Sequence, residues 1–227
     1  MRRNRLLNVV ILVALAILSR PILAADVPAG VYTLDLAHAS LIFRVDHIGF
    51  SNYTARFTRF DATLEFDPEN LAASSVVATV DARSIETHYP ETDKHDFNAQ
   101  LQNEQWLDTA KFPEMTFRST KVEVTGPNAM RIHGEFELHG VAQPVILDAT
   151  YNGGYAGHPL EPRARIGFSA RGALKRSDFG IAYGIPTAEM PMGVGDVVEI
   201  IIEAEFTGPP LADAAMRSPD YGARSAP

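Results

Sequence analysis

Two polar side chains stand out in this sequence because each occurs among apolar neighbours. His47 shares the apolar face of its segment with Phe43 and Val45, and Arg176 opens the stretch Arg-Ser-Asp-Phe-Gly at 176–180. Such a histidine could contact the polar head of a ligand, or be a core or rim residue whose ring bonds to nearby backbone. Such an arginine could bind a ligand phosphate, or have a structural role such as pairing with a carboxylate. The sequence leaves both alternatives open for both residues.

Four other histidines do not have the spacing of a metal site. His88 and His95 are seven residues apart in a charged stretch, which fits no tight zinc motif, so we assign them to a surface loop. His133 and His139 fall on the polar face of one segment, and we expect both in solvent. No serine lies in a nucleophile elbow, and no phosphate loop or dinucleotide fingerprint is present. We therefore expect no metal, no cofactor and no catalysis.

Composition and charge exclude several functions. The chain has 227 residues, a net charge of −8 and no cysteine, which rules out disulfides and a cysteine nucleophile. The excess of acid argues against a nucleic-acid partner, because phosphate backbones are bound by basic surfaces. Four further basic residues could meet an anionic head group, and the sequence does not say which of them lies near one: Arg56, Arg59, Arg171 and Lys175.

Phenylalanines recur on the apolar side of segments in which apolar and polar residues alternate. This period of two is typical of strands with one face in water and the other in a core. The clearest segments are 60–67, 131–139, 165–175 and 198–206, and weaker ones are 31–36, 41–48, 76–82, 115–124 and 145–151. The phenylalanines on the dry faces are Phe43, Phe60, Phe66, Phe136, Phe168 and Phe206.

About nine strands joined by short turns indicate an all-β domain, either a barrel or a sandwich. The alternation stops in Glu91–Trp106, where Phe97 and Leu101 are four residues apart and predict a short helix capped near Thr92. A barrel of about eight strands can fill its interior with side chains or hold one ligand. Periodicity alone does not distinguish a packed barrel from a hollow one.

Residues 1–24 have the order of a secretory signal peptide. Three arginines precede Leu6–Leu18, an apolar run of about 13 residues that is shorter than the roughly 20 a spanning helix needs. Ala24 offers a small residue for cleavage. We therefore expect export and a periplasmic location, one domain at 25–207, and a disordered tail at 208–227.

Several segments together resemble the YceI family of exported, lipid-binding proteins. The strongest is Ala-Lys-Phe-Pro-Glu-Met-Thr-Phe-Arg-Ser-Thr at 110–120. Others are Val-Asp-His-Ile-Gly-Phe at 45–50, Asn-Glu-Gln-Trp-Leu-Asp at 103–108 and Arg-Ser-Asp-Phe-Gly-Ile at 176–181. Their order and spacing along most of the chain carry the resemblance. One departure is Ala55-Arg56, where the family often has a glycine before the next phenylalanine.

The resemblance implies an extended antiparallel lipocalin-like β-barrel with one or two short helices and an apolar channel. In that family the channel takes a long isoprenoid chain, usually of a polyprenyl phosphate or a quinone. We therefore expect a lipid carrier whose ligand contacts Phe43, His47, Phe60, Phe66, Phe136, Phe168, Arg176 and Phe206. The alternative is a packed barrel that acts as a scaffold for a membrane redox system. Association into a homodimer is also left open.

Overall fold

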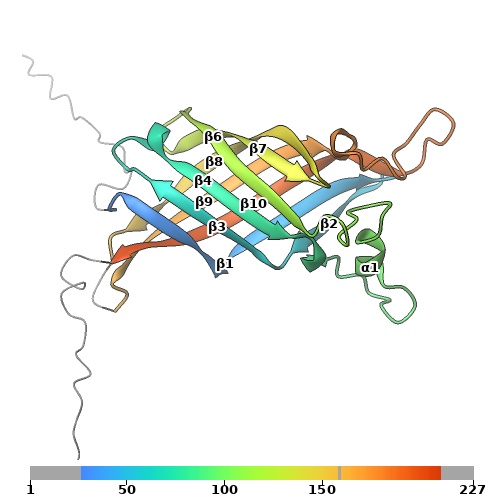
Figure 1. Ribbon diagram of the computed structural model, residues 1–227, viewed down its shortest axis with the longest axis horizontal. Helices are drawn as coiled ribbons and strands as arrows, with labels where there is room; N and C mark the ends of the chain where they lie inside the picture. The colour runs from blue at the N-terminus through green and yellow to red at the C-terminus, as the bar shows by residue number, and fades with distance from the viewer. Residues whose placement is uncertain (1–26, 158–159, 211–227) are drawn as a thin grey trace, which may run out of the picture.

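Ten strands form one antiparallel sheet in the computed structural model, which describes residues 27–157 and 160–210 (Figure 1). They are β1 (Gly30–His47), β2 (Ser51–Phe57), β3 (Phe60–Phe66), β4 (Ser75–Asp81), β5 (Ile85–Glu86), β6 (Glu114–Val124), β7 (Ala129–Leu138), β8 (Val141–Tyr155), β9 (Arg163–Lys175) and β10 (Val194–Pro210). Eight strands follow the order β10-β9-β8-β7-β6-β4-β3-β1, and β1 pairs with β10 to close a barrel. The predicted antiparallel barrel is confirmed.

Closure gives each barrel strand one face toward the interior and one toward solvent. On β9, Ile166 and Ala170 are buried, whereas Arg171 is exposed. Because successive side chains of a strand point to opposite faces, the alternation in the sequence specifies which residues enter the barrel. The hydrophobic core therefore lies inside the barrel rather than between two sheets.

Strand β1 is continuous, although the sequence pattern predicted separate strands at 31–36 and 41–48. Leu34 pairs with Phe206 and Ala39 with Ala204, so β1 carries extra residues against β10 between these pairs. Such a bulge bends a strand. The first part of β1 pairs with β3 and the second with β2. Strands β2 and β5, which the pattern did not predict, extend the sheet beside the second part.

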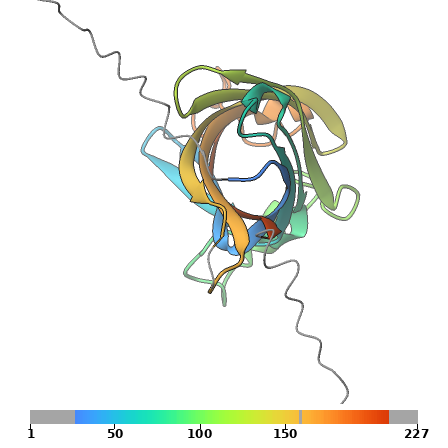
Figure 2. The same ribbon diagram turned by 90° about the vertical axis from the view of Figure 1, so that its left-hand side faces the viewer.

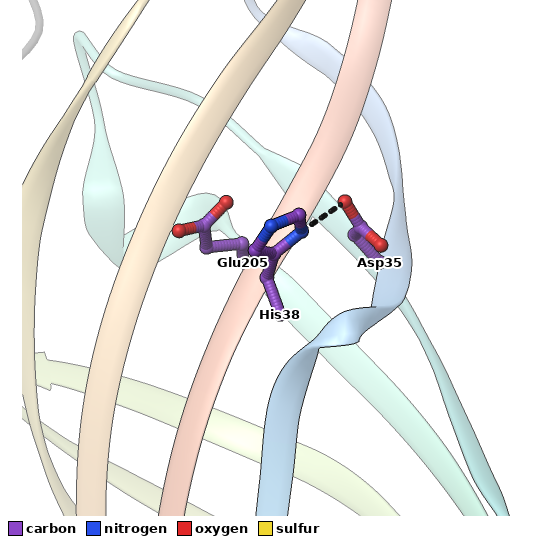
Figure 3. A group of neighbouring side chains, drawn as sticks. All are labelled: Asp35, His38 and Glu205. Atoms are coloured by element: carbon purple, nitrogen blue, oxygen red, sulfur yellow. Dashed lines mark hydrogen bonds and ion pairs between the residues drawn. The ribbon is translucent and has the colours of Figure 1, made fainter.

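A cluster of charged side chains holds this bulge. Asp35 accepts a hydrogen bond of 3.1 Å from the Ala37 amide, and its other oxygen lies 2.9 Å from Nδ1 of His38 (Figure 3). Nη1 of Arg165, on β9, lies 2.6 Å from Asp35 and 2.8 Å from Glu205 on β10. Hydrogen bonds from Arg165 and then from His38 lower the pKa of Asp35 to about 2. The cluster thus joins the bend of β1 to two neighbouring strands.

One end of the barrel is filled by aromatic rings and by the segment that precedes β1. Tyr32 and Tyr151 are buried, and the Tyr32 hydroxyl donates to the carbonyl of Pro28 at 2.7 Å. Val27 is also buried and belongs to the core. Figure 2 shows the barrel from this end, with the start of the chain's described part crossing the opening. We name this side of the barrel the tyrosine end.

The opposite end carries the predicted short helix, with different bounds. Helix α1 spans Phe97–Leu101, and the Asp96 carboxylate caps it by accepting a bond from the Ala99 amide at 2.9 Å. The prediction of a cap near Thr92 is wrong, because that residue lies in a turn before the helix. Three short 3-10 helices complete the structure: η1 (Leu71–Ala73), η2 (Ala82–Ser84) and η3 (Arg176–Phe179). Among the described residues, no helix is long and apolar enough to cross a membrane.

Strand β10 continues to Pro210, so the ordered domain extends beyond the expected boundary at residue 207. A Cβ at Gly208 would overlap the ring of Tyr32, and the Gly208 carbonyl accepts a 3.1 Å bond from Nε of Arg163. Residue 208 therefore packs against the tyrosine end rather than beginning a tail. The rest of the expected tail and the expected signal peptide lie outside the described residues.

We expect Gly208→Ala to destabilise the fold by about 1–3 kcal/mol, because the added methyl group must displace a buried tyrosine ring. The measurement is the free energy of unfolding in urea. Gly126→Ala is the matched control, since its Cβ would lie 3.4 Å from the Cβ of Ala129, an ordinary contact. Equal stability of the two variants would show that Gly208 does not pack against Tyr32.

We expect Asp35→Asn to lower stability in a pH-dependent way. A carboxyl whose pKa is lowered by folding stabilises the native state above its unfolded pKa, and this effect is lost as the pH falls toward the folded value. The loss should be about 1–2 kcal/mol above pH 5 and should vanish near pH 2. Melting temperatures between pH 2 and 7 test this. Asp148→Asn is the control, because that carboxylate is 75% exposed in its ion pair with Arg131.

Candidate ligand-binding cavity

The barrel encloses a cavity of about 630 Å³. This volume is about twenty times the space of one water molecule in the liquid and lies in the range of small-molecule sites. Side chains from all eight barrel strands line it, together with residues of β2, α1 and the segment after α1. The lining is mostly aliphatic and aromatic, so the cavity suits a ligand with a long apolar part. The barrel is therefore hollow, which the sequence had left undecided.

All eight residues that the sequence predicted as ligand contacts line this cavity: Phe43, His47, Phe60, Phe66, Phe136, Phe168, Arg176 and Phe206. They come from five strands and from η3, and barrel closure brings them together. Their contact with a ligand remains a prediction.

Near the tyrosine end, the cavity-lining rings of Phe66, Phe168 and Phe206 belong to a cluster of aromatic side chains. Phe66 lies 5.8 Å from Tyr32 and 6.0 Å from Tyr151, and Phe168 lies 6.1 Å from both Phe66 and Phe206, measured between ring centroids. Burial raises the pKa of Tyr32 to about 12, with a smaller contribution from Tyr151, and burial also raises the pKa of Tyr151. Both phenols are therefore neutral at physiological pH, and this end of the cavity carries no charge.

His47 lies at the opposite end, where β1 finishes. It lines the cavity and is also exposed, and it pairs with Ser51 of β2 and Val194 of β10. The structure thus supports a rim position over a core position for this histidine. Because His47 both lines the cavity and reaches solvent, the cavity opens near the end of β1.

Arg176 is only 5% exposed, and its guanidinium is held by backbone carbonyls. Its Nε donates to Gly195 at 2.9 Å, its Nη1 to Ile181 at 3.1 Å and to Tyr183 at 2.8 Å, and its Nη2 to Val194 at 2.8 Å. These carbonyls belong to the two stems of the loop that joins η3 to β10. Arg176 therefore fixes the base of this loop, which projects from the α1 end of the barrel (Figure 1).

Trp106 covers the guanidinium of Arg176. The Arg176 Cζ lies 5.3 Å from the Trp106 ring centroid. The ring of Tyr183 packs edge to face against Trp106, with 5.3 Å between the two ring centroids. Both Trp106 and Arg176 line the cavity. Burial lowers the pKa of the Arg176 guanidinium, and the Asp196 carboxylate opposes this effect. A guanidinium remains protonated in a protein even when burial lowers its pKa, so a buried positive charge lies at this end of the cavity.

Sequence reasoning missed several lining residues because they lie where the alternation stops. Trp106, Phe97, Tyr89 and His95 line the cavity near α1. His95 is exposed, as expected for a surface loop, but its ring lies 6.0 Å from Phe97 and it also reaches the cavity. The sequence did contain a signal for these residues, namely apolar side chains in a stretch without alternation. Such side chains must still be buried somewhere.

The other basic residues considered from the sequence face away from the cavity. Arg56 pairs with Glu86 at 2.8 Å and Arg59 with Asp81 at 2.9 Å. Arg171 and Lys175 are exposed on the outer face of β9, and none of these four lines the cavity.

His139 corrects one expectation. It was predicted to be in solvent, but it is half-buried, with Nδ1 3.1 Å from the Phe179 carbonyl oxygen and its ring 4.7 Å from that of Phe112. His139 lies just after β7 and has a φ of 55°, so the alternation of the strand does not extend to its side chain.

Among residues 27–157 and 160–210, one group of potential metal ligands occurs on the outer surface: Asp35, His38 and Glu205, whose ligand atoms lie within 4.8 Å of one another (Figure 3). The Arg165 guanidinium already bonds to both carboxylates of this group. Their negative charge is thus balanced by a side chain, and the group acts as the ion-pair cluster that holds the β1 bulge.

A closed antiparallel barrel with an apolar interior cavity defines the class of ligand-holding β-barrels. Residues 32–206 match the YceI-like domain, and the chain belongs to this family. A UPF0312 protein of Vibrio cholerae is 37% identical over 179 residues, which cover 78% of this chain and 87% of the relative.

Two solved structures are similar in fold. BcnA of Burkholderia cenocepacia has a TM-score of 0.62 and 23% identity, covering 76% of this chain and 98% of BcnA. A polyisoprenoid binding domain from Saccharophagus degradans has a TM-score of 0.55 and 16% identity, covering 78% of this chain and 98% of that domain. At these identities, the likeness establishes the architecture.

We expect Arg176→Met to destabilise the protein by about 2–4 kcal/mol, because it leaves buried carbonyls without donors. The loop at 182–193 should also become more sensitive to protease, since its two stems lose their common anchor. Urea unfolding and limited proteolysis measure the two effects. Arg171→Met, on the exposed outer face of β9, is the control. A variant of Arg176 with normal stability and an intact loop would contradict the anchoring role.

Proposed function

We propose that this protein binds one long-chain isoprenoid lipid, of polyprenyl phosphate or quinone type, and sequesters or carries it in the periplasm. The observation that carries the proposal is the cavity of about 630 Å³ with its aliphatic and aromatic lining. The name of the Saccharophagus degradans domain, which describes polyisoprenoid binding in a similar barrel, supports it. The N-terminal sequence supports export.

The physical argument concerns the ligand's tail. An isoprenoid tail has no hydrogen-bonding groups, so its affinity must come from apolar area removed from water, about 25 cal/mol per Å². A wall of phenylalanine, leucine and valine provides that area without leaving polar groups unpaired. We propose a carrier rather than an enzyme, because the residues that line the cavity serve to hold an apolar chain.

The direct test is native mass spectrometry of the protein purified from the periplasm of its own cells, followed by organic extraction. We expect an additional mass that extracts as a polyprenyl or quinone species. A protein without bound mass that also takes up no added isoprenoid lipid would contradict the proposal. It would favour the alternative of a scaffold for a membrane redox system.

A cavity-filling variant tests where the lipid lies. Ala78 on β4 lines the cavity and pairs with Ala62 of β3, so Ala78→Phe places a ring in empty space. We expect binding of an added isoprenoid to weaken at least about tenfold while the melting temperature stays equal or rises, since filling a cavity restores contacts. The measurements are lipid titration and thermal unfolding.

Val77→Phe is the matched control for this variant. Val77 is the preceding residue of β4 and does not line the cavity, because neighbouring side chains of a strand point to opposite faces. Lipid binding should be normal in this control. A folded Ala78→Phe protein with unchanged affinity would show that the lipid is bound outside the barrel.

A further inference from the structure

Two loops at the α1 end of the barrel present large apolar side chains to solvent. Phe50, in the turn between β1 and β2, is 84% exposed. Met190 and Met192, in the loop between η3 and β10, are 63% and 62% exposed, and Tyr183 of the same loop is also exposed. Single exposed apolar residues are ordinary on a protein surface, whereas several at one place mark an interaction site.

The two loops lie side by side at the opening of the cavity. The Ile48 amide, in the β1–β2 turn, donates to the Gly193 carbonyl of the other loop at 2.9 Å. Next to this bond, His47 of β1 pairs with Val194 of β10, and both residues line the cavity. The exposed apolar residues of both loops therefore flank the place where the cavity reaches solvent.

The loop that carries the methionines is held in a defined shape. Its stems are joined by a bond from the Val194 amide to the Gly184 carbonyl at 2.8 Å and by the anchoring bonds of Arg176. Its far turn is closed by a bond from the Thr187 amide to the Met190 carbonyl at 2.9 Å. A loop that is already ordered loses little conformational entropy when its side chains contact a partner.

The charge of these loops matches the interface of a lipid bilayer. The loop at 180–193 contains no lysine or arginine and one carboxylate, that of Glu189, and the turn at 48–50 contains no charged residue. Apolar side chains enter the boundary between head groups and hydrocarbon, and rings such as that of Tyr183 lie at the level of the head groups. The charged loop before α1 projects separately from the η3–β10 loop (Figure 1).

We propose that these two loops dock on a lipid bilayer, with Phe50, Met190 and Met192 inserted at the boundary of its hydrocarbon. This inference rests on the proposed function, because a ligand with a long apolar chain is dissolved in a membrane before it is bound. A chain that crosses water exposes apolar area along its whole length. Docking places the cavity opening against the bilayer, so the chain moves between bilayer and barrel without that exposure.

The test uses the absence of cysteine, which allows a dye to be attached at one chosen position. Met190→Cys and Val31→Cys are purified from the periplasm, labelled with an environment-sensitive nitrobenzoxadiazole dye and mixed with vesicles of phosphatidylcholine and phosphatidylethanolamine. We expect the dye at position 190 to brighten several-fold and to shift to the blue. The dye at position 31 should not respond, although Val31 is 56% exposed at the tyrosine end. The response should persist in about 0.5 M salt, because insertion does not depend on screened charges.

A combined variant tests the three inserted side chains together: Phe50→Gln, Met190→Gln and Met192→Gln. We expect its affinity for the same vesicles, measured by flotation, to fall at least about tenfold, because three apolar side chains lose their contact with hydrocarbon. None of the three lines the cavity, so uptake of farnesol from solution should be unchanged. The matched control changes three exposed apolar residues elsewhere on the barrel: Val31→Gln, Val124→Gln and Ile146→Gln.

The outcomes separate the docking surface from the proposed function. A response of the dye at both ends, a response at position 31 alone, or unchanged vesicle binding of the combined variant would overturn the docking surface. A response at position 190 that grows with protein concentration without vesicles would indicate a second copy on this surface and would also overturn it. Normal uptake of farnesol in these cases would leave the proposed function intact. A response at position 190 alone, without any uptake of farnesol, would support the docking surface and refute the proposed function.

Discussion

The pairing of β1 with β10 is the constraint on which the rest of the structure depends. It joins the first strand to the last and turns an open sheet into a barrel, so that the apolar faces of eight strands meet. The bulge between Leu34 and Ala39 allows β1 to pair first with β3 and then with β2 on one side. On its other side, β1 remains paired with β10. Arg165 connects that bulge to two neighbouring strands, which explains why a charged cluster lies outside an apolar barrel.

The cavity exists because barrel closure sets the width of the interior and small side chains leave part of that interior unfilled. An eight-stranded barrel has an interior that side chains can just fill. Here alanines occupy inward positions on several strands, among them Ala62, Ala78 and Ala170, and leave space between the phenylalanines. Empty apolar space forfeits dispersion contacts, so a ligand tail that fills it gains contacts that the protein alone lacks.

Much of this architecture could be predicted from the alternation of apolar and polar residues and from the resemblance to the YceI family. The alternation predicted which side of each strand is dry, and closure then placed all eight predicted residues at one cavity. The pattern could not predict β2 or the packing of Gly208 on Tyr32, because these depend on partners distant in sequence. Trp106 was missed for the same reason, since its contact with Arg176 joins two irregular segments.

Arg176 has the structural role that was one of the two alternatives left open by the sequence. Its carbonyl bonds are structural, because they hold both stems of the loop between η3 and β10. The same bonds fix the guanidinium at the cavity wall against Trp106. A cation held by neutral dipoles keeps its charge available, whereas one held by a carboxylate would not. The structural role of Arg176 therefore also fixes a buried positive charge at this end of the cavity.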